Sequence, residues 1–303
     1  MKRRRNRGES FTLFLMCRNN LRSLKRSLPN ILGQCPRERI VAFDTESEDG
    51  TADLLIENGI EVKKIRRSEF SHGHTRNLSL EYSNAEIFLF LNGDAIPVSG
   101  WLKELIRGID GYDAAFSRQI PDEDCDPLRI TDLIHHPYFN RDSDASITRD
   151  SENPILFDTV SCAIRRKTLE RYNFPEVPFG EDFLWAQIVV KDGGGILYAH
   201  KSIVIHSHSL YRSIRQTINR HFEEGRLKSD YRGEYGLNYF LRFLPSAFLL
   251  DTMTILGSKM PQNERLLWFI KEPICRYLQL ISFYAGLNHN LIPGIIKRGL
   301  VWK

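Results

Sequence analysis

The chain has 303 residues, of which 42% are hydrophobic and 26% charged. This composition is typical of a soluble globular protein with one large α/β domain or two smaller ones. The net charge of +4 does not describe the folded part of the chain. Five positive charges belong to Lys2, Arg3, Arg4, Arg5 and Arg7, and residues 8–303 have a net charge near −1. Residues 1–10 therefore predict a basic, flexible tail, either solvated or attracted to anionic lipid or nucleic acid, and the folded part gives no reason to expect a nucleic-acid binder.

The cysteines and the hydropathy pattern narrow the class of protein further. Five cysteines, at positions 17, 35, 125, 162 and 275, are scattered and form no CxxC motif. This argues against a disulfide framework or a cysteine zinc site and favours a reducing compartment. No apolar run reaches the roughly 18 residues of a membrane span, and the first ten residues lack a signal-peptide core. We expect a cytosolic protein.

Residues 11–109 alternate between predicted strands and predicted helices. Apolar runs predict strands over 11–16, 39–43 and 87–91, and alternation of apolar and polar residues predicts a strand over 60–65. Helical spacing or helix-end signals predict helices over 21–32, 51–58, 75–83 and 101–109. Such alternation indicates crossover units and a mostly parallel sheet. Ligands of such sheets bind beyond the carboxyl ends of the strands. Asp44 and Asp94 each follow a predicted strand, so both should face the same crevice.

The second half of the chain has a different pattern. Residues 121–154 are rich in Asp, Pro, Asn and Ser and predict a long loop, a feature that often serves as a functional lid. Further predictions are a helix over 181–190, a strand or hairpin over 196–205 and an amphipathic helix over 210–222. From about residue 230 the composition shifts towards aromatic residues, Leu and Ile, which predicts helices over 238–257, 263–271 and 274–287. These patterns predict a main domain over 11–229 and a helical extension over 230–303.

Two polar segments follow predicted strands and each has two interpretations. The segment DTESEDGT, from Asp44 to Thr51, offers groups for the N–H and hydroxyl groups of a nucleoside, or it is a polar loop with a helix cap at Ser47 or Asp49. In NGDA, Asp94 is a carboxylate at a strand end, which suits Mg²⁺ or Mn²⁺ on a diphosphate. The alternative is an ordinary Asn-Gly-Asp turn.

Acidic and histidine segments later in the chain offer further chemistry. In FGED, Glu181 and Asp182 begin a predicted helix, either because acids favour helix N-termini or because one is a general base. In HSH, strand alternation puts His206 and His208 on one face, as a metal pair or as two partly exposed histidines. The HGH segment at residues 72–74 repeats the spacing and raises the alternative of a zinc hydrolase, for which the sequence shows no suitable further ligands.

The order of the segments carries a resemblance that no single segment does. The series CRNN, DTESEDGT, FSHGHTRN, FLNGDAIP, FSRQIP, FGEDFLWA and VIHSHSLYR resembles the inverting nucleotide-sugar glycosyltransferases of family 2, and above all their bacterial rhamnosyltransferase-like members, over residues 11–226. The resemblance implies the GT-A fold: an α/β, Rossmann-like, mostly parallel sheet flanked by helices, here with a C-terminal helical extension. The segment RQTINRHF does not match the QxxRW motif of processive synthases, so we expect transfer of one or a few sugars.

The resemblance implies a role for each matching residue. Asp182 matches the catalytic base, and Asn92 stands where many relatives have the first Asp of a DxD-type motif. The implied donor nucleotide-binding residues are Asp44, Thr45, Arg76, Asn92 and Gly93. The implied ligands of Mg²⁺ or Mn²⁺ are Asp94, His206 and His208. The implied acceptor or phosphate contacts are Glu181, Arg118 and Trp185.

These observations favour a metal-dependent inverting glycosyltransferase. Its partners would be a nucleotide-sugar donor and a cell-surface glycan or lipid-linked precursor, with no nucleic acid, and rhamnose follows only from the resemblance. The aromatic and basic residues after 230 either pack as an ordinary core or form an amphipathic surface that holds the protein on the inner face of the cytoplasmic membrane. The alternatives are a catalytically silent GT-A module that binds nucleotide within a glycan-assembly complex, and the zinc hydrolase.

Overall fold

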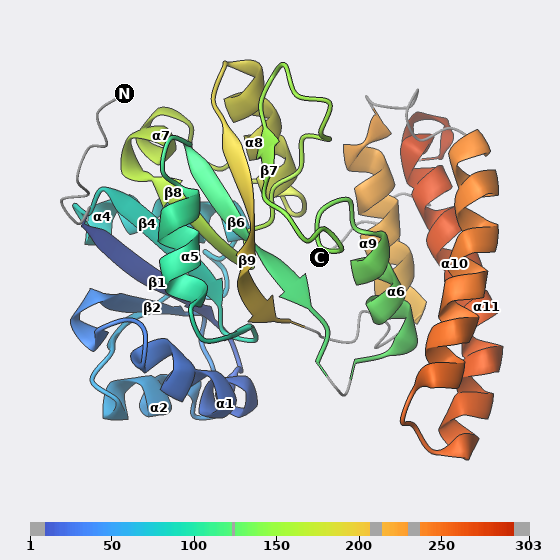
Figure 1. The fold of residues 1–303 in the computed structure, drawn as a ribbon, viewed down its shortest axis with the longest axis horizontal. Coiled ribbons are helices and arrows are strands. Elements are labelled where there is room, and N and C mark those ends of the chain that lie inside the picture. Colours follow the sequence, from blue (N-terminus) through green and yellow to red (C-terminus); the bar gives the residue numbers. More distant parts are fainter. Residues whose placement is uncertain (1–9, 123–124, 207–213, 230–236, 294–303) are drawn as a thin grey trace. The chain divides into compact units, whose positions relative to one another are not determined.

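The computed structural model describes residues 10–122, 125–206, 214–229 and 237–293, which form two compact units (Figure 1). The described residues of unit 1 fall in 10–120, 137–177 and 181–206, and the others belong to unit 2. This division does not coincide with the predicted boundary at residue 230, because residues 121–136 and 214–229 belong to unit 2. The segment predicted as one long loop, 121–154, is thus shared between the units.

The described part of unit 1 is built on one sheet. Its strands are β1 Phe11–Cys17, β2 Ile40–Asp44, β3 Glu61–Lys64, β4 Ile87–Asn92, β5 Ile96–Pro97, β6 Ala114–Ile120, β7 Ala145–Ile147, β8 Ser161–Arg165 and β9 Ile196–Ile205. They are ordered β3-β2-β1-β4-β8-β6-β9-β5, and β7 pairs with β9. β3, β2, β1 and β4 are parallel, and β6 is parallel to β9, whereas β8 runs antiparallel between β4 and β6. The predicted α/β class with a mostly parallel sheet is confirmed.

The helices of unit 1 follow the strands largely as predicted, except that the helix at Arg166–Arg171 is not predicted from the sequence and one predicted helix is divided. They are α1 Leu21–Leu32, α2 Thr51–Glu57, α3 His72–Asn77, α4 Ser79–Tyr82, α5 Trp101–Gly108, α7 Arg166–Arg171 and α8 Glu181–Lys191, with a 3-10 turn, η1, at Arg37–Arg39. The single helix predicted over 75–83 is two short helices and begins at His72, because Ser71 caps α3 by accepting the N–H of His74 at 3.1 Å.

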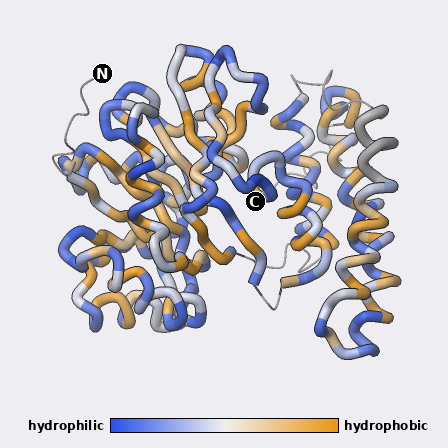
Figure 2. Tube along the Cα trace, in the orientation of Figure 1, coloured by the Kyte–Doolittle hydropathy of each residue, from blue (hydrophilic) through white to orange (hydrophobic). Residues whose placement is uncertain are grey.

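Both faces of the sheet are covered at β2 and β4, which is why these two strands are nearly continuous apolar runs (Figure 2). Successive side chains of a strand point to opposite faces. Leu13 therefore joins the core cluster that contains residues of α1 and α5. Phe14 points to the other face, where its ring centroid lies 5.3 to 5.7 Å from those of Phe43, Phe88 and Phe90.

The middle of the chain differs most from the sequence-based prediction. The predicted loop over 121–154 contains a helix, α6 Pro127–His135, as well as β7. The prediction is wrong there because a start signal is hidden in a polar composition: Asp126 accepts the N–H of Arg129 at 2.9 Å, and Pro127 is the first helical residue. The structure also contains two strands, β6 and β8, that the sequence pattern does not predict.

Unit 2 is helical in its described residues, so the predicted helical extension is confirmed. It contains α6, α9 Ile214–Leu227, α10 Leu237–Gly257, α11 Gln262–Leu287 and a 3-10 turn, η3, at His289–Leu291. α11 continues through Pro273, which corrects the two separate helices predicted over 263–271 and 274–287; this proline is exposed and costs only one backbone hydrogen bond. Across the described part of the chain, no helix combines the length and the hydropathy that crossing a bilayer requires.

Candidate active site

The carboxyl ends of β1, β2 and β4 meet at one edge of the sheet. The last residues of β2 and β4, Asp44 and Asn92, are aligned with the last two residues of β1. The next residues are tied to the same strand, because the N–H groups of Thr45 and Gly93 each donate to a carbonyl of β1 at 2.9 Å. The structure thus brings together four of the five residues predicted to bind the donor nucleotide.

The loops that follow β1 and β2 hold each other in place. Asp44 is buried, and its carboxylate accepts the N–H and the hydroxyl of Ser47. Ser47 accepts the N–H of Asn19 at 2.9 Å, and Asp49 accepts the N–H of Leu21, the first residue of α1, at 2.9 Å. Asp44 therefore fixes the loop, but a carboxylate offers about four acceptor positions. It retains the capacity to receive a donor group of a nucleoside.

Gly93 is required by a close approach of two loops. A Cβ atom at this position would lie 2.7 Å from Oδ1 of Asn20, a contact that real Cβ atoms do not make. Oδ1 of Asn20 is itself held, since it accepts the N–H of Arg18 at 2.7 Å. The glycine thus lets the chain pass from Asn92 to Asp94 directly against the loop after β1.

Asp94 lies beside His206, which follows β9. Nε2 of His206 is 3.4 Å from Oδ1 of Asp94, and Nδ1 of His206 is 2.8 Å from Oε1 of Gln119 on β6. With the amide oxygen of Gln119 as acceptor, Nδ1 carries the proton and Nε2 is turned towards the Asp94 carboxylate. Two ligands at about 2.1 Å from one metal ion, at a right angle, are about 3 Å apart, so the pair fits a shared cation.

The HGHTRN segment forms α3 and holds the chain that precedes α8. A Cβ atom at Gly73 would lie 2.4 Å from the carbonyl oxygen of Pro175, so only glycine allows this backbone contact. The Asn77 amide donates to the carbonyl of Phe174 and accepts its N–H, both at 2.9 Å. Nδ1 of His74, in the same segment, lies 3.1 Å from Oε1 of the exposed Glu176.

Arg76 and Glu181 form a buried ion pair next to Asp182. Nη1 of Arg76 donates to Oε1 of Glu181 at 2.9 Å, and the two side chains are 2% and 7% exposed. The predicted contact of Arg76 with the nucleotide stays a prediction, and in this structure the guanidinium is held by Glu181. The pair joins α3 to the start of α8 and so fixes the position of Asp182.

Asp182 has the electrostatic surroundings of a general base. The side chain is half-buried, and its burial together with the charges of Glu181 and Asp158 raises the pKa of Asp182 to about 8. The charge of Arg76 and the N–H of Phe183, which donates to Oδ1 of Asp182 at 2.7 Å, lower this pKa. A general base works best when its pKa lies near the operating pH.

Trp185 lies in the interior of unit 1. Its side chain is fully buried, its Nε1–H donates to the carbonyl of Tyr172 at 2.7 Å, and its ring stacks on Phe174 at a centroid distance of 5.2 Å. In this structure the residue is part of the core, and its acceptor contact stays a prediction. Arg118 is half-buried on β6 beside the irregularity between residues 117 and 118, and its role stays a prediction.

Comparison with known proteins places this site in a family. The family model described as "Glycosyl transferase family 2" matches residues 12–173, more than half of the chain. The chain belongs to glycosyltransferase family 2. It is therefore an enzyme that transfers a glycosyl group from a nucleotide sugar, as the sequence predicts. The match includes the edge formed by β1, β2 and β4, and it ends before α8 and β9.

Two curated relatives extend the likeness beyond that range. The transferase is 25% identical to the O-antigen chain rhamnosyltransferase RfbN of Salmonella typhimurium, over 84% of this chain and 91% of that protein. It is 26% identical to the O-antigen chain rhamnosyltransferase WbaN of Salmonella anatum, over 81% of this chain and 85% of that protein. Since each relative covers more than four-fifths of the chain, the likeness extends beyond the residues of the family match.

Solved structures confirm the GT-A fold of the transferase. The mannosyltransferase PcManGT of Pyrobaculum calidifontis, in complex with GDP-Man and Mn²⁺, is 15% identical with a TM-score of 0.58 over 92% of this chain and 87% of that one. TarS 1-349 of S. aureus, in complex with UDP, is 16% identical with a TM-score of 0.55 over 84% and 68% of the two chains. At these identities the likeness concerns the fold alone.

The zinc-hydrolase alternative depends on two histidine pairs, and one of them lies partly outside the described residues. His208 lies outside the described residues. Within them, no group of three or more His, Cys, Asp or Glu side chains is placed to hold a metal. Two residues of the site, Gln119 and Asp158, are absent from the sequence prediction. Gln119 stands in the FSRQIP segment, which offered a signal, whereas nothing local marks Asp158.

Proposed function

We propose that this glycosyltransferase moves a sugar from a nucleoside diphosphate sugar to a hydroxyl of a cell-surface glycan or its lipid-linked precursor. Rhamnose is the sugar that we propose. The observation that carries this proposal is the likeness to two O-antigen chain rhamnosyltransferases over more than four-fifths of both chains. The reaction would take place in the cytoplasm, since all five cysteines are free thiols, as in proteins of reducing compartments.

The donor nucleotide would lie along the edge formed by β1, β2 and β4. Asp44 and Thr45 would receive the base or the ribose, since the buried carboxylate of Asp44 still has unused acceptor positions. Asn92 and Gly93 would line the path to the diphosphate. This assignment agrees with the rule that ligands of parallel sheets bind beyond the carboxyl ends of the strands.

Asp94 and His206 would hold a divalent cation, Mg²⁺ or Mn²⁺, and Gln119 would orient the imidazole. A site with few protein ligands suits such an ion, because the diphosphate and water complete its coordination. When bound, the ion neutralises the charge that develops on the departing nucleoside diphosphate. The bond from Gln119 to Nδ1 keeps Nε2 directed at the cation, which is the usual arrangement of a metal-binding histidine.

Asp182 would act as the general base for the acceptor. The hydroxyl oxygen forms a bond to the anomeric carbon while the bond from that carbon to the phosphate oxygen breaks, and the hydroxyl proton passes to the Asp182 carboxylate. A single displacement inverts the anomeric centre and needs one base, unlike the carboxylate pairs of glycosidases. Arg76 and Glu181 would position Asp182.

A ligand screen followed by an activity assay tests this proposal. The thermal midpoint of the purified chain is measured with dTDP, UDP and GDP, each with and without Mn²⁺, because a ligand present at 100 times its Kd stabilises the folded state by about 2.7 kcal/mol. We expect one nucleotide to raise the midpoint and to do so more strongly with the metal. Transfer from the matching nucleotide sugar to a glycan acceptor is then followed by mass spectrometry. No stabilisation by any nucleoside diphosphate would contradict the donor assignment.

A further inference from the structure

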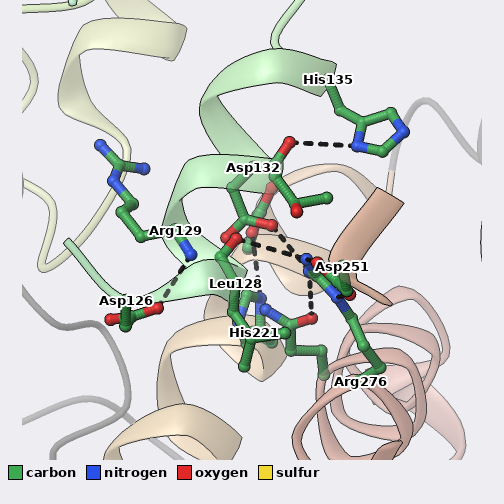
Figure 3. Close-up of polar contacts among 11 residues, drawn as sticks. Asp126, Leu128, Arg129, Asp132, His135, His221, Asp251 and Arg276 are labelled. Carbon is green, nitrogen blue, oxygen red and sulfur yellow. Dashed lines mark hydrogen bonds and ion pairs between the residues drawn. The ribbon is translucent and has the colours of Figure 1, made fainter. Parts of the chain in front are cut away.

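Helix α11 buries several polar residues in the interior of unit 2. Arg276 is 1% exposed, and its guanidinium donates to both carboxylate oxygens of Asp251 on α10, at 2.7 and 2.9 Å, and to Asp132 on α6 at 2.7 Å (Figure 3). Glu272 and Gln279, one turn away on either side, are buried as well. Amphipathic helices of water-soluble proteins do the reverse. The ion pairs inside unit 2 thus leave the apolar residues of α11 on its outer side.

The outer side of α11 is apolar along most of its length. A stripe of side chains that recur every three or four residues is between 48% and 65% exposed: Leu266, Ile270, Ile274, Tyr277, Ile281 and Tyr284. α10 carries a second stripe, formed by Leu249, Met253 and Leu256. Figure 2 shows hydrophobic residues recurring along both helices. Surfaces that face only water rarely expose a contiguous apolar patch of this kind.

The charge around this stripe is positive. Among the described residues from 245 to 293, the charged side chains that reach the surface are three basic and one acidic, Lys259, Arg265, Lys271 and Glu264, while Asp251, Glu272 and Arg276 are buried. Lys259 and Lys271 are exposed. A second copy of the chain on the same face would bring these positive charges together, which disfavours self-association. An anionic surface would instead be attracted to them.

We propose that the exposed stripes of α10 and α11, defined by the nine residues above, dock on the surface of a membrane that contains anionic lipids. The apolar side chains would enter the boundary between headgroups and acyl chains, and the lysines would contact the headgroups. Tyr277 and Tyr284 suit that boundary because their rings have an apolar body and a polar tip. Lys271, Glu272 and Arg276 lie in the middle of α11, where a spanning helix would carry them into the bilayer centre at high cost. The helix would therefore lie on the membrane.

Flotation of the full chain with vesicles tests this proposal. Vesicles of phosphatidylethanolamine and phosphatidylglycerol are compared with vesicles of phosphatidylcholine alone, at low and high salt. We expect the protein to float with the anionic vesicles and to bind at least about tenfold more weakly to the neutral ones or at high salt. The double variant Ile274→Glu/Ile281→Glu, which removes two apolar contacts and adds two negative charges, should lower binding by at least about tenfold as well.

The matched control is Ile56→Glu on α2, since Ile56 is 56% exposed and Ile274 is 53% exposed. This variant should float like the wild type, and circular dichroism should show that both variants are folded. No flotation of the wild type, or equal losses in both variants, would overturn the proposal. So would a dimer in sedimentation that the α11 variant dissociates, because the stripe would then belong to a second copy. Stabilisation by nucleoside diphosphate in the α11 variant should be unchanged, which separates this test from that of the active site.

Discussion

Replacement of Asp182 by asparagine should have opposite effects on catalysis and on stability. Asparagine has nearly the same shape but cannot accept the proton of the acceptor hydroxyl. General base catalysis contributes about 10² to 10⁴ in rate, so we expect transfer to fall by at least about 100-fold. In the wild type, transfer should rise with pH up to about pH 8, as the Asp182 carboxyl loses its proton.

The effect on stability follows from the same pKa. Folding raises the pKa of the Asp182 carboxyl from 3.8 to about 8, so between these values the folded state binds more protons than the unfolded chain. Its stability contribution is therefore lost as the pH rises through this window. At about 1.4 kcal/mol per pKa unit, the upper limit at pH 7 is about 4 kcal/mol. Because the side chain is half-buried, we expect Asp182→Asn to gain only about 1–3 kcal/mol at pH 7.

Urea unfolding of metal-free protein between pH 4 and pH 8.5 measures this gain. The free energy of unfolding of Asp182→Asn should exceed that of the wild type by an amount that grows from near zero at pH 4 to a plateau above pH 8. Glu57→Gln, which makes the same change on the exposed end of α2, should follow the wild type throughout. Transfer by Asp182→Asn at the wild-type rate would refute the base assignment. A difference in stability that does not change with pH would refute the electrostatic argument.

The remaining predictions concern the metal and donor site and two buried ion pairs. Asp94→Ala should lower metal-dependent transfer about 100-fold or more, whereas Asn92→Ala should weaken donor binding about tenfold, measured by calorimetry and initial rates; equal losses would mean that the metal ligand is misassigned. Arg76→Met leaves Glu181 buried without its cation and should lower the free energy of unfolding by about 3–5 kcal/mol, measured with urea. Arg276→Met should destabilise unit 2 by a similar amount, and hydrogen exchange should rise in α6, α10 and α11; unchanged exchange there would contradict the role of this arginine.

The sequence determined the parallel half of the fold and the edge of the active site. Apolar runs that end in polar segments are a local signal, and parallel strands necessarily bring their carboxyl ends to the same edge. The positions of Asp44, Asn92 and Asp94 on that edge follow from this rule alone. The order of segments such as FLNGDAIP and FGEDFLWA predicted the family, which the comparisons confirm over residues 12–173.

Contacts between distant parts of the chain were decided only by the tertiary structure. Gln119 and His206 are 87 residues apart, and Arg76 and Glu181 are 105 residues apart. Each pair meets because the folded chain brings two distant elements together, and no local periodicity in the sequence encodes such a contact. Trp185 illustrates the same limit, since the sequence places it beside Asp182 but only packing decides that it is fully buried.

Helix α11 separates the two kinds of information most clearly. Apolar residues recur every three to four residues in its sequence, where the composition predicts two helices and leaves open whether they pack as a core or form an amphipathic surface. The period does not say which side faces inward, because that depends on the partners of the polar side. In the folded chain Asp251 and Asp132 supply those partners to Arg276, so the polar side is buried and the apolar side is exposed. Burial depends on complementary groups from other elements, and these exist only once the chain has folded.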